Sequence, residues 1–160
     1  MKKNPGKTVR LSILILFAIF AAIQFIPYGR HQANPPVVKE PGWDSPKTRE
    51  LAKRACFDCH SNETKMPWYV GVAPASWLIW SDIRSGRAAL NFSEWQGSGR
   101  ESETPAELAK EINEGEMPPF QYTIFHPAAR LSDAEKRQLA DGLAATVQRN
   151  GINTVGQRQN

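Results

Sequence analysis

The sequence predicts an all-α protein in which one N-terminal transmembrane helix precedes a small helical domain. The chain has 160 residues, which is enough for one modest domain with accessory segments. A long apolar run without charge lies near the N-terminus, and helix-start signals recur after it. No stretch alternates polar and apolar residues for long enough to predict a strand.

Residues 11–26 form the apolar run, in which 14 of 16 side chains are apolar, and no charge lies between Arg10 and Arg30. A helix over this gap would be roughly 28 Å long, close to the thickness of a bilayer's hydrocarbon core. We therefore expect a transmembrane anchor at 11–28, behind a basic cytoplasmic segment at 1–10. A cleaved signal peptide is the alternative, but the bulky residues after the run do not resemble a small-residue cleavage site.

The basic charge of the chain lies at its N-terminus. The first 30 residues hold five of the 20 basic residues and no acidic one, which leaves 15 basic and 16 acidic residues for the remainder. The remainder lacks the basic surface that nucleic-acid binding needs, so we expect no nucleic acid as partner. Basic residues before an apolar run keep that end in the cytoplasm, which predicts a single-pass protein of a bacterial inner membrane with its C-terminal domain in the periplasm.

After the anchor, residues 29–43 are rich in proline and predict a linker. Residues 44–148 form the expected domain, and the tail at 149–160 has too little apolar content for a stable structure. The domain is small, so we expect a large flat ligand to complete its core among the aromatic side chains Trp68, Trp77, Trp80, Phe92, Trp95, Phe120 and Phe125.

Four helices are predicted within the domain. The first begins at Ser45, a cap residue before a proline, and runs to about Cys56. The second follows Pro74 and runs to about Leu90. The third opens with a capping box at 104–107 and stops at Gly115.

The fourth predicted helix opens with another capping box, at 132–135. Its apolar positions recur at helical spacing, so it is expected to bury Leu139, Leu143 and Val147.

Both cysteines of the chain fall in the run Cys56-Phe57-Asp58-Cys59-His60. Two residues between the thiols let one helical turn present both sulfurs to the two vinyl groups of a haem, and the next residue can offer an imidazole nitrogen to the iron. The run therefore predicts one covalently bound haem c, with Cys56 and Cys59 as attachment points and His60 as an axial iron ligand. Covalent attachment of this type occurs outside the bacterial inner membrane, in agreement with the predicted orientation.

Three other interpretations of the cysteines remain open. A redox dithiol shares the C-x-x-C spacing but needs a βαβ setting, which the sequence does not indicate. A structural zinc site needs four ligands, and the other histidines, His31 and His126, lie far from the run and from each other. A disulfide between the cysteines leaves His60 without a role.

Met117 is the preferred candidate for the second axial ligand. It follows the helix stop at Gly115, and two prolines after it restrict the loop, which lowers the entropy lost on ligation. His126 would instead give an iron with two histidine ligands. Two further interpretations are ligation by Met66, only six residues after His60, and an open sixth position.

Several stretches of the chain resemble small class I c-type cytochromes and, more closely, the haem-binding domain family of bacterial membrane-anchored or exported proteins. The resemblance covers nearly all of 43–147 and is carried by 56–69, 73–79, 90–95 and 115–132. It implies covalent haem at Cys56 and Cys59, iron ligation by His60 and a sixth ligand at Met117. Leu143 departs from the family, whose last helix often carries a tryptophan there.

Two functions follow from these observations. The first is a membrane-anchored periplasmic cytochrome that carries single electrons between redox partner proteins. The second is a haem enzyme or sensor with an open or displaceable position for peroxide or a diatomic gas, where His126, Glu114 or Glu116 would supply acid–base help. The single haem motif excludes a two-haem peroxidase on this chain alone.

Overall fold

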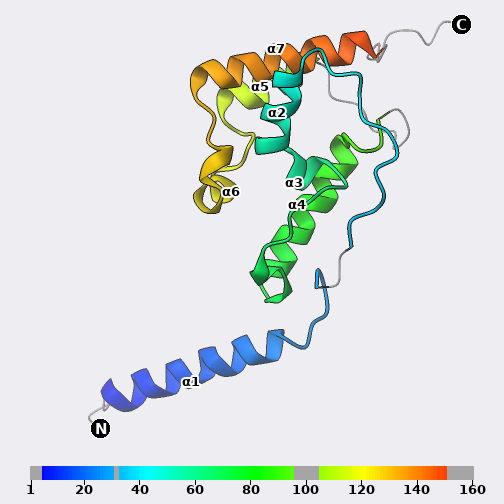
Figure 1. The fold of residues 1–160 in the computed structure, drawn as a ribbon. Coiled ribbons are helices and arrows are strands. Elements are labelled where there is room, and N and C mark those ends of the chain that lie inside the picture. Colours follow the sequence, from blue (N-terminus) through cyan, green and yellow to red (C-terminus); the bar gives the residue numbers. More distant parts are fainter. Residues whose placement is uncertain (1–4, 31–32, 96–104, 151–160) are drawn as a thin grey trace, which may run out of the picture. The chain divides into compact units, whose positions relative to one another are not determined.

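The computed structural model describes residues 5–30, 33–95 and 105–150 (Figure 1). The described residues form seven α-helices and two short 3₁₀ helices and contain no strand, which confirms the all-α prediction. A single parallel bridge between Lys39 and Glu94 is their only β-type pairing. The chain divides into two units: unit 1 comprises Met1–Ala33 and Met66–Asp82, and unit 2 comprises Asn34–Lys65 and Ile83–Asn160.

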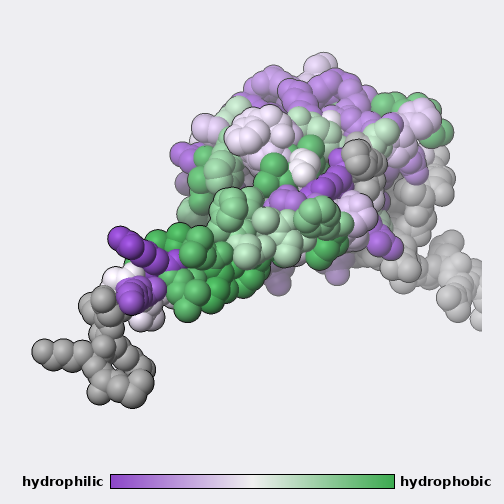
Figure 2. Space-filling model, turned by 90° about the horizontal axis from the view of Figure 1, so that it is seen from below, coloured by the Kyte–Doolittle hydropathy of each residue, from purple (hydrophilic) through white to green (hydrophobic). Residues whose placement is uncertain are grey.

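Unit 1 contains α1 (Pro5–Ile23), the 3₁₀ helix η1 (Trp68–Gly71) and the beginning of α4 (Ala75–Ala89). The window Gly6–Ile23 of α1 is long and apolar enough to cross a membrane. Its surface is hydrophobic along the helix and hydrophilic near the N-terminus (Figure 2).

The bounds of α1 differ from the expected anchor at 11–28. The helix begins earlier, at Pro5, since a proline is tolerated in the first turn of a helix. It ends earlier, at Ile23, because Pro27 lacks a backbone N–H and disfavours helical geometry in the residue before it.

Unit 2 is built on α7 (Asp133–Arg149), which packs along α5 (Pro105–Glu114) and against α2 (Pro46–Ala55), as Figure 1 shows. The short helix α3 (Phe57–His60) follows α2 directly. The remaining elements of this unit are the end of α4, α6 (Phe120–Phe125) and η2 (Pro127–Ala129).

The predicted helix signals are present where the structure describes them. Ser45 caps α2 by accepting a hydrogen bond from the backbone N–H of Thr48, and Ser132 and Glu135 form the capping box of α7. Gly115, at φ +78°, ends α5 as expected. Thr104, the predicted cap of α5, lies outside the described residues.

The helix α6 was not expected, because its sequence shows neither a side-chain cap nor enough length for a clear period. The predicted second helix is present as α4 and ends one residue before Leu90.

The core of unit 2 lies between α2, α5 and α7 and extends to the residues that follow α4. Leu139, Leu143 and Val147 are buried, as predicted. The aromatic rings of Trp43, Phe57 and Phe92 gather beside them, and Trp95 stacks on Phe92. The buried cluster consists of Leu51, Ala52, Ala55, Phe57, Leu90, Phe92, Trp95, Leu108, Ile112, Ala129, Leu131, Leu139, Ala140, Leu143 and Val147.

Part of the segment expected as a linker is bonded to unit 2. The backbone N–H groups of Val38 and Lys39 donate to the carbonyl of Ser93, at 2.9 and 3.0 Å, and the N–H of Trp95 donates to the carbonyl of Lys39 at 3.0 Å. The amide of Asn62 also donates to the carbonyl of Pro36. Residues 36–39 are therefore held by the unit that carries the cysteines.

Candidate haem-binding site

The C-x-x-C-H run folds as a compact turn at the junction of α2 and α3. Cys56 ends α2, and its carbonyl accepts hydrogen bonds from the backbone N–H groups of Cys59 and His60, at 3.1 and 2.9 Å. Phe57, between the two cysteines, is 2% exposed and packs into the aromatic core. The buried ring of Phe57 therefore anchors the short turn that carries both cysteines.

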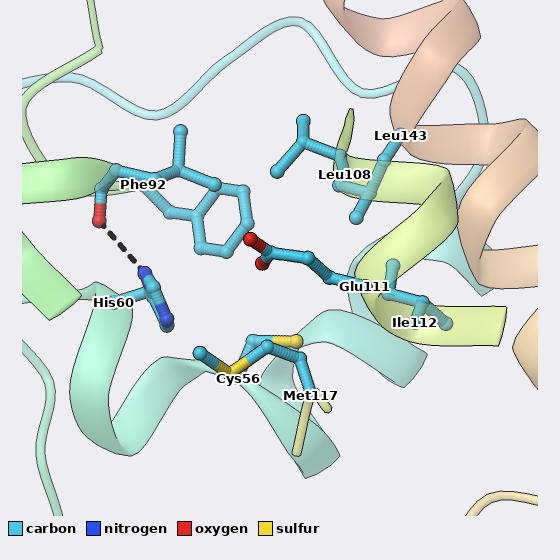
Figure 3. Close-up of a pocket in the computed structure, with 9 residues that line it drawn as sticks. Cys56, His60, Phe92, Leu108, Glu111, Ile112, Met117 and Leu143 are labelled. Carbon is cyan, nitrogen blue, oxygen red and sulfur yellow. Dashed lines mark hydrogen bonds between the residues drawn. The ribbon is translucent and has the colours of Figure 1, made fainter. Parts of the chain in front are cut away.

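The imidazole of His60 is oriented by the backbone that follows α4. Its Nδ1 lies 3.2 Å from the carbonyl oxygen of Leu90 (Figure 3), so in the neutral ring Nδ1 donates and Nε2 carries the lone pair. Burial lowers the pKa of His60, which favours the neutral ring that a metal ligand must be. The backbone N–H of Phe92 also donates to the carbonyl of His60, at 2.8 Å.

The end of α4 approaches the C-x-x-C-H turn closely. Gly86 is buried in this helix, and a Cβ atom at this position would lie 2.6 Å from the carbonyl oxygen of Cys59. No side chain fits that gap, so glycine allows α4 to lie directly against the turn. The turn is thus supported by α2 on one side and by α4 on the other.

Cys56, His60 and Met117 line one small cavity of about 30 Å³ (Figure 3). Met117 reaches it from the loop after α5, where the N–H groups of Glu116 and Met117 donate to the carbonyl of Glu111 at 2.9 and 3.1 Å. The structure therefore brings three of the predicted site residues together. The other residues of the lining are mostly apolar: Leu90, Phe92, Leu108, Glu111, Ile112 and Leu143.

The other predicted residues lie elsewhere. Cys59 is half-buried on the same turn but does not line the cavity. His126 ends α6; its ring stacks on Tyr122 with centroids 4.0 Å apart, and its Nδ1 lies 3.0 Å from the carbonyl of Tyr122. Glu114 and Glu116 are exposed outside the lining, and Met66 belongs to unit 1.

The aromatic side chains that we expected around a flat ligand differ in burial. Phe92 lines it, and Trp95 is buried next to Phe92. Phe120 and Phe125 are exposed on α6, and Trp68 is exposed in unit 1. Composition alone does not tell a core residue from a surface one, and the expectation of a flat ligand among all these aromatic side chains stays a prediction.

Two residues of the site were missed by the sequence analysis. Glu111 lines the cavity, and the signal for this was its place on the same helical face as Leu108 and Ile112. Tyr122 donates a hydrogen bond of 2.7 Å from its hydroxyl to the carboxylate of Asp58, inside the C-x-x-C-H run. Burial and the neighbouring Asp58 raise the pKa of Tyr122, so it stays a neutral donor.

The thiol of Cys56 does not resemble a redox-active one. Burial, and then the neighbouring Cys59, raise its pKa to about 12. Catalytic dithiols instead lower the pKa of one cysteine to form a thiolate. Nor do the described residues contain a group of three His, Cys, Asp or Glu side chains placed to hold a metal ion, so the zinc interpretation gains no support.

The side chains present fit a haem better than either of these sites. The thiol of Cys56, the neutral imidazole of His60 and the thioether of Met117 line one mostly apolar cavity, and Cys59 lies on the same turn as Cys56 and His60. The cavity is too small to hold the whole macrocycle, so a neighbouring segment has to move outward when haem enters.

The helical fold and this cavity define a small helical haem-binding domain. A comparison with family models agrees: the chain belongs to the haem-binding domain family, whose model matches residues 18–145. Neither the curated proteins nor the solved structures gave a match to this chain.

Proposed function

We propose that this protein is a membrane-anchored monohaem c-type cytochrome that carries single electrons at the periplasmic face of a bacterial inner membrane. The observation that carries the proposal is the meeting of Cys56, His60 and Met117 at one mostly apolar cavity. Family membership supports the haem, and the cysteine spacing supports its covalent attachment.

Cys56 and Cys59 are the residues that would hold the haem covalently. Each sulfur would form one C–S bond to a vinyl group, and the thiol hydrogen would pass to the other vinyl carbon, so no external oxidant or reductant is needed. The raised pKa of the Cys56 thiol disfavours disulfide exchange, which proceeds through a thiolate.

His60 and Met117 are the residues that would ligate the iron. The Leu90 carbonyl keeps the His60 ring in one tautomer, so its Nε2 is oriented before ligation. A bound haem supplies an iron that cycles between Fe(II) and Fe(III). A Met117 thioether ligand would raise the reduction potential relative to a second imidazole, and the apolar side chains around it would exclude water.

Membrane attachment through α1 would tether the haem-binding domain to the bilayer. The window Gly6–Ile23 suits a bilayer, and Lys7 and Arg10 near its start favour a cytoplasmic N-terminus. Redox proteins in the same membrane or in the periplasm are then the proposed partners.

Glu111 favours a second candidate function. Its side chain lines the cavity together with Met117, so a carboxyl group would lie next to a sixth position vacated by the thioether (Figure 3). Such a group is what a peroxide-reactive or gas-sensing site needs for proton transfer. In this function Glu111 takes the acid–base role for which we had considered His126, Glu114 and Glu116.

Absorption and electron paramagnetic resonance spectra of the purified full chain separate the two functions. The electron carrier predicts low-spin, six-coordinate iron with a thioether-to-iron charge-transfer band in the oxidised state, and no binding of carbon monoxide in the reduced state. High-spin iron that binds carbon monoxide would support the second candidate. In that case Glu111→Gln should slow the reaction with peroxide, whereas the exposed Glu114→Gln should not.

A further inference from the structure

Unit 1 contains an uncharged aromatic segment besides α1. The 16 residues from Met66 to Ser81 carry no charge and hold three of the chain's five tryptophans. We call residues 66–81 the interfacial segment. Two of its large side chains are strongly exposed: Trp68 is 89% and Leu78 65% exposed. Exposing two large apolar side chains to water within one short segment is unfavourable in free energy. This surface is therefore suited to an apolar partner.

The interfacial segment is bonded to the end of α1. Gln24, the first residue after α1, pairs with both backbone groups of Ala73: its Nε2 donates to the carbonyl at 2.9 Å, and its Oε1 accepts from the N–H at 3.1 Å. Gly29, at φ +75°, lies so close to Ser76 that a Cβ would be 2.3 Å from its carbonyl oxygen. These contacts hold the segment next to the C-terminal end of α1.

The length of α1 fixes the depth of these contacts in a bilayer. The 18-residue window Gly6–Ile23 spans roughly 27 Å, which matches the hydrocarbon core. Gln24 and its partner Ala73 then lie at the boundary between hydrocarbon and headgroups. Phe25 and Tyr28, one and four residues after Gln24, are exposed as well. Tryptophan and tyrosine side chains favour this depth, because they pair an apolar ring with a polar N–H or O–H group.

We propose that the interfacial segment lies in the headgroup region of the outer leaflet and inserts Trp68 and Leu78 between the lipids. The inference rests on the proposed membrane anchoring, since it places a second contact beside the helix that crosses the bilayer. Lipid is favoured over a protein partner because protein interfaces carry a polar and charged rim, and all 16 residues here are uncharged.

Photolabelling of the full chain in phosphatidylcholine vesicles tests this proposal. A phosphatidylcholine with a diazirine in its acyl chain and a water-soluble diazirine are used in parallel, and labelled peptides are mapped by mass spectrometry. The proposal predicts lipid labelling in both α1 and the interfacial segment. Lipid labelling of α1 alone, with aqueous labelling of residues 66–81, would overturn it while leaving the anchor intact. Aqueous labelling of both segments would contradict the anchoring itself.

A pair of matched variants tests the surface involved. Trp68→Glu changes an exposed ring and should reduce lipid labelling of the interfacial segment several-fold without affecting α1. Phe120→Glu changes a ring that is 77% exposed on α6 and serves as control, so labelling of residues 66–81 should stay as in the wild type. Unchanged labelling in Trp68→Glu would show that Trp68 does not contact lipid, which would overturn the proposal.

Discussion

The hydroxyl of Tyr122 donates a hydrogen bond of 2.7 Å to Oδ2 of Asp58, and this bond joins α6 to the turn that carries both cysteines. The other carboxylate oxygen of Asp58 accepts from the N–H of Lys65 at 3.0 Å, so the acceptor is itself held in place. Tyr122 follows Met117 by only five residues. The bond therefore limits how far the Met117 loop can move from the C-x-x-C-H turn.

Tyr122→Phe should loosen this loop. The substitution removes one hydrogen bond to a charged group in a half-buried position, so we expect a loss of about 1–2 kcal/mol in the free energy of unfolding. The thioether-to-iron band should also weaken, because Met117 is held less firmly. Denaturant unfolding and absorption spectra measure the two effects.

Thr123→Ala is the control for this prediction. The Thr123 hydroxyl donates only to the carbonyl of Phe120 on the exposed side of α6, so its loss should cost a few tenths of a kcal/mol and leave the band unchanged. Equal effects of the two substitutions would contradict a special role for the Tyr122–Asp58 bond.

Met117→Ala should open the sixth position of the iron. We expect a shift to high spin, a lower reduction potential and binding of carbon monoxide, since among the described residues only Cys56 and His60 bring another sulfur or imidazole to the cavity lining. Met117→His should keep low spin and also lower the potential, because an imidazole stabilises Fe(III) better than a thioether does.

His126→Ala is the matched variant on α6. It removes the ring stack on Tyr122 and should cost about 1 kcal/mol of stability while leaving the spectrum nearly unchanged. Spectra in which His126→Ala opens the iron and Met117→Ala does not would replace the Met117 assignment with a bis-histidine one.

Gly86→Ala should destabilise the domain although alanine is the better helix former. The added Cβ would meet the carbonyl oxygen of Cys59 at 2.6 Å, and overpacking of this kind costs about 1–3 kcal/mol, against a gain of about 1 kcal/mol in helix propensity. Thermal and denaturant unfolding measure the net loss. Ser85→Ala, an exposed change in the same helix, should be neutral or slightly stabilising. A more stable Gly86→Ala would mean that α4 does not lie against the turn.

Glu135 should make the domain sensitive to acid. Hydrogen bonds from Arg54 and from Ser132 lower the pKa of Glu135 to about 2. The folded state therefore favours the ionised form of Glu135. The stability that these contacts provide is fully present above the ordinary glutamate pKa, and it is lost as the pH falls from that value to about 2.

Denaturant unfolding of Glu135→Gln across this pH range tests whether the stability contributed by Glu135 is lost as the pH falls. The variant should be less stable than the wild type at neutral pH, and the difference should shrink as the pH approaches 2. Arg137→Gln, at an exposed arginine of the same helix, should leave the acid dependence unchanged. A Glu135→Gln variant whose deficit stays constant with pH would contradict the lowered pKa.

The local features of this protein were predictable from its sequence because each depends on neighbouring residues. Ser45, Gly115 and the Ser132–Glu135 box act within one helical turn, and the structure bears them out. The turn from Cys56 to His60 likewise depends on short spacing alone. These local signals therefore predict the Cys56–His60 turn of the candidate site.

The remaining features depend on contacts between distant residues. Helix α6 has no buried residue and no side-chain cap, and the Tyr122–Asp58 bond joins residues 64 positions apart. Helical periodicity places Glu111 on the same face as Leu108, but only packing shows that this face meets His60. The bonds from Val38 and Lys39 to Ser93 could not be predicted either, because proline-rich composition is the same in a free linker and in a docked one.

Covalent attachment of one haem is the central claim, and the intact mass of the denatured protein tests it most directly. The full chain is produced in a bacterial host with c-type maturation and measured after acid extraction of unbound haem. We predict the mass of the polypeptide plus one haem, with neither Cys56 nor Cys59 open to alkylation, and the bare polypeptide mass for the variant with Cys56→Ala and Cys59→Ala. A folded wild-type chain of bare polypeptide mass with two alkylatable cysteines would contradict the account.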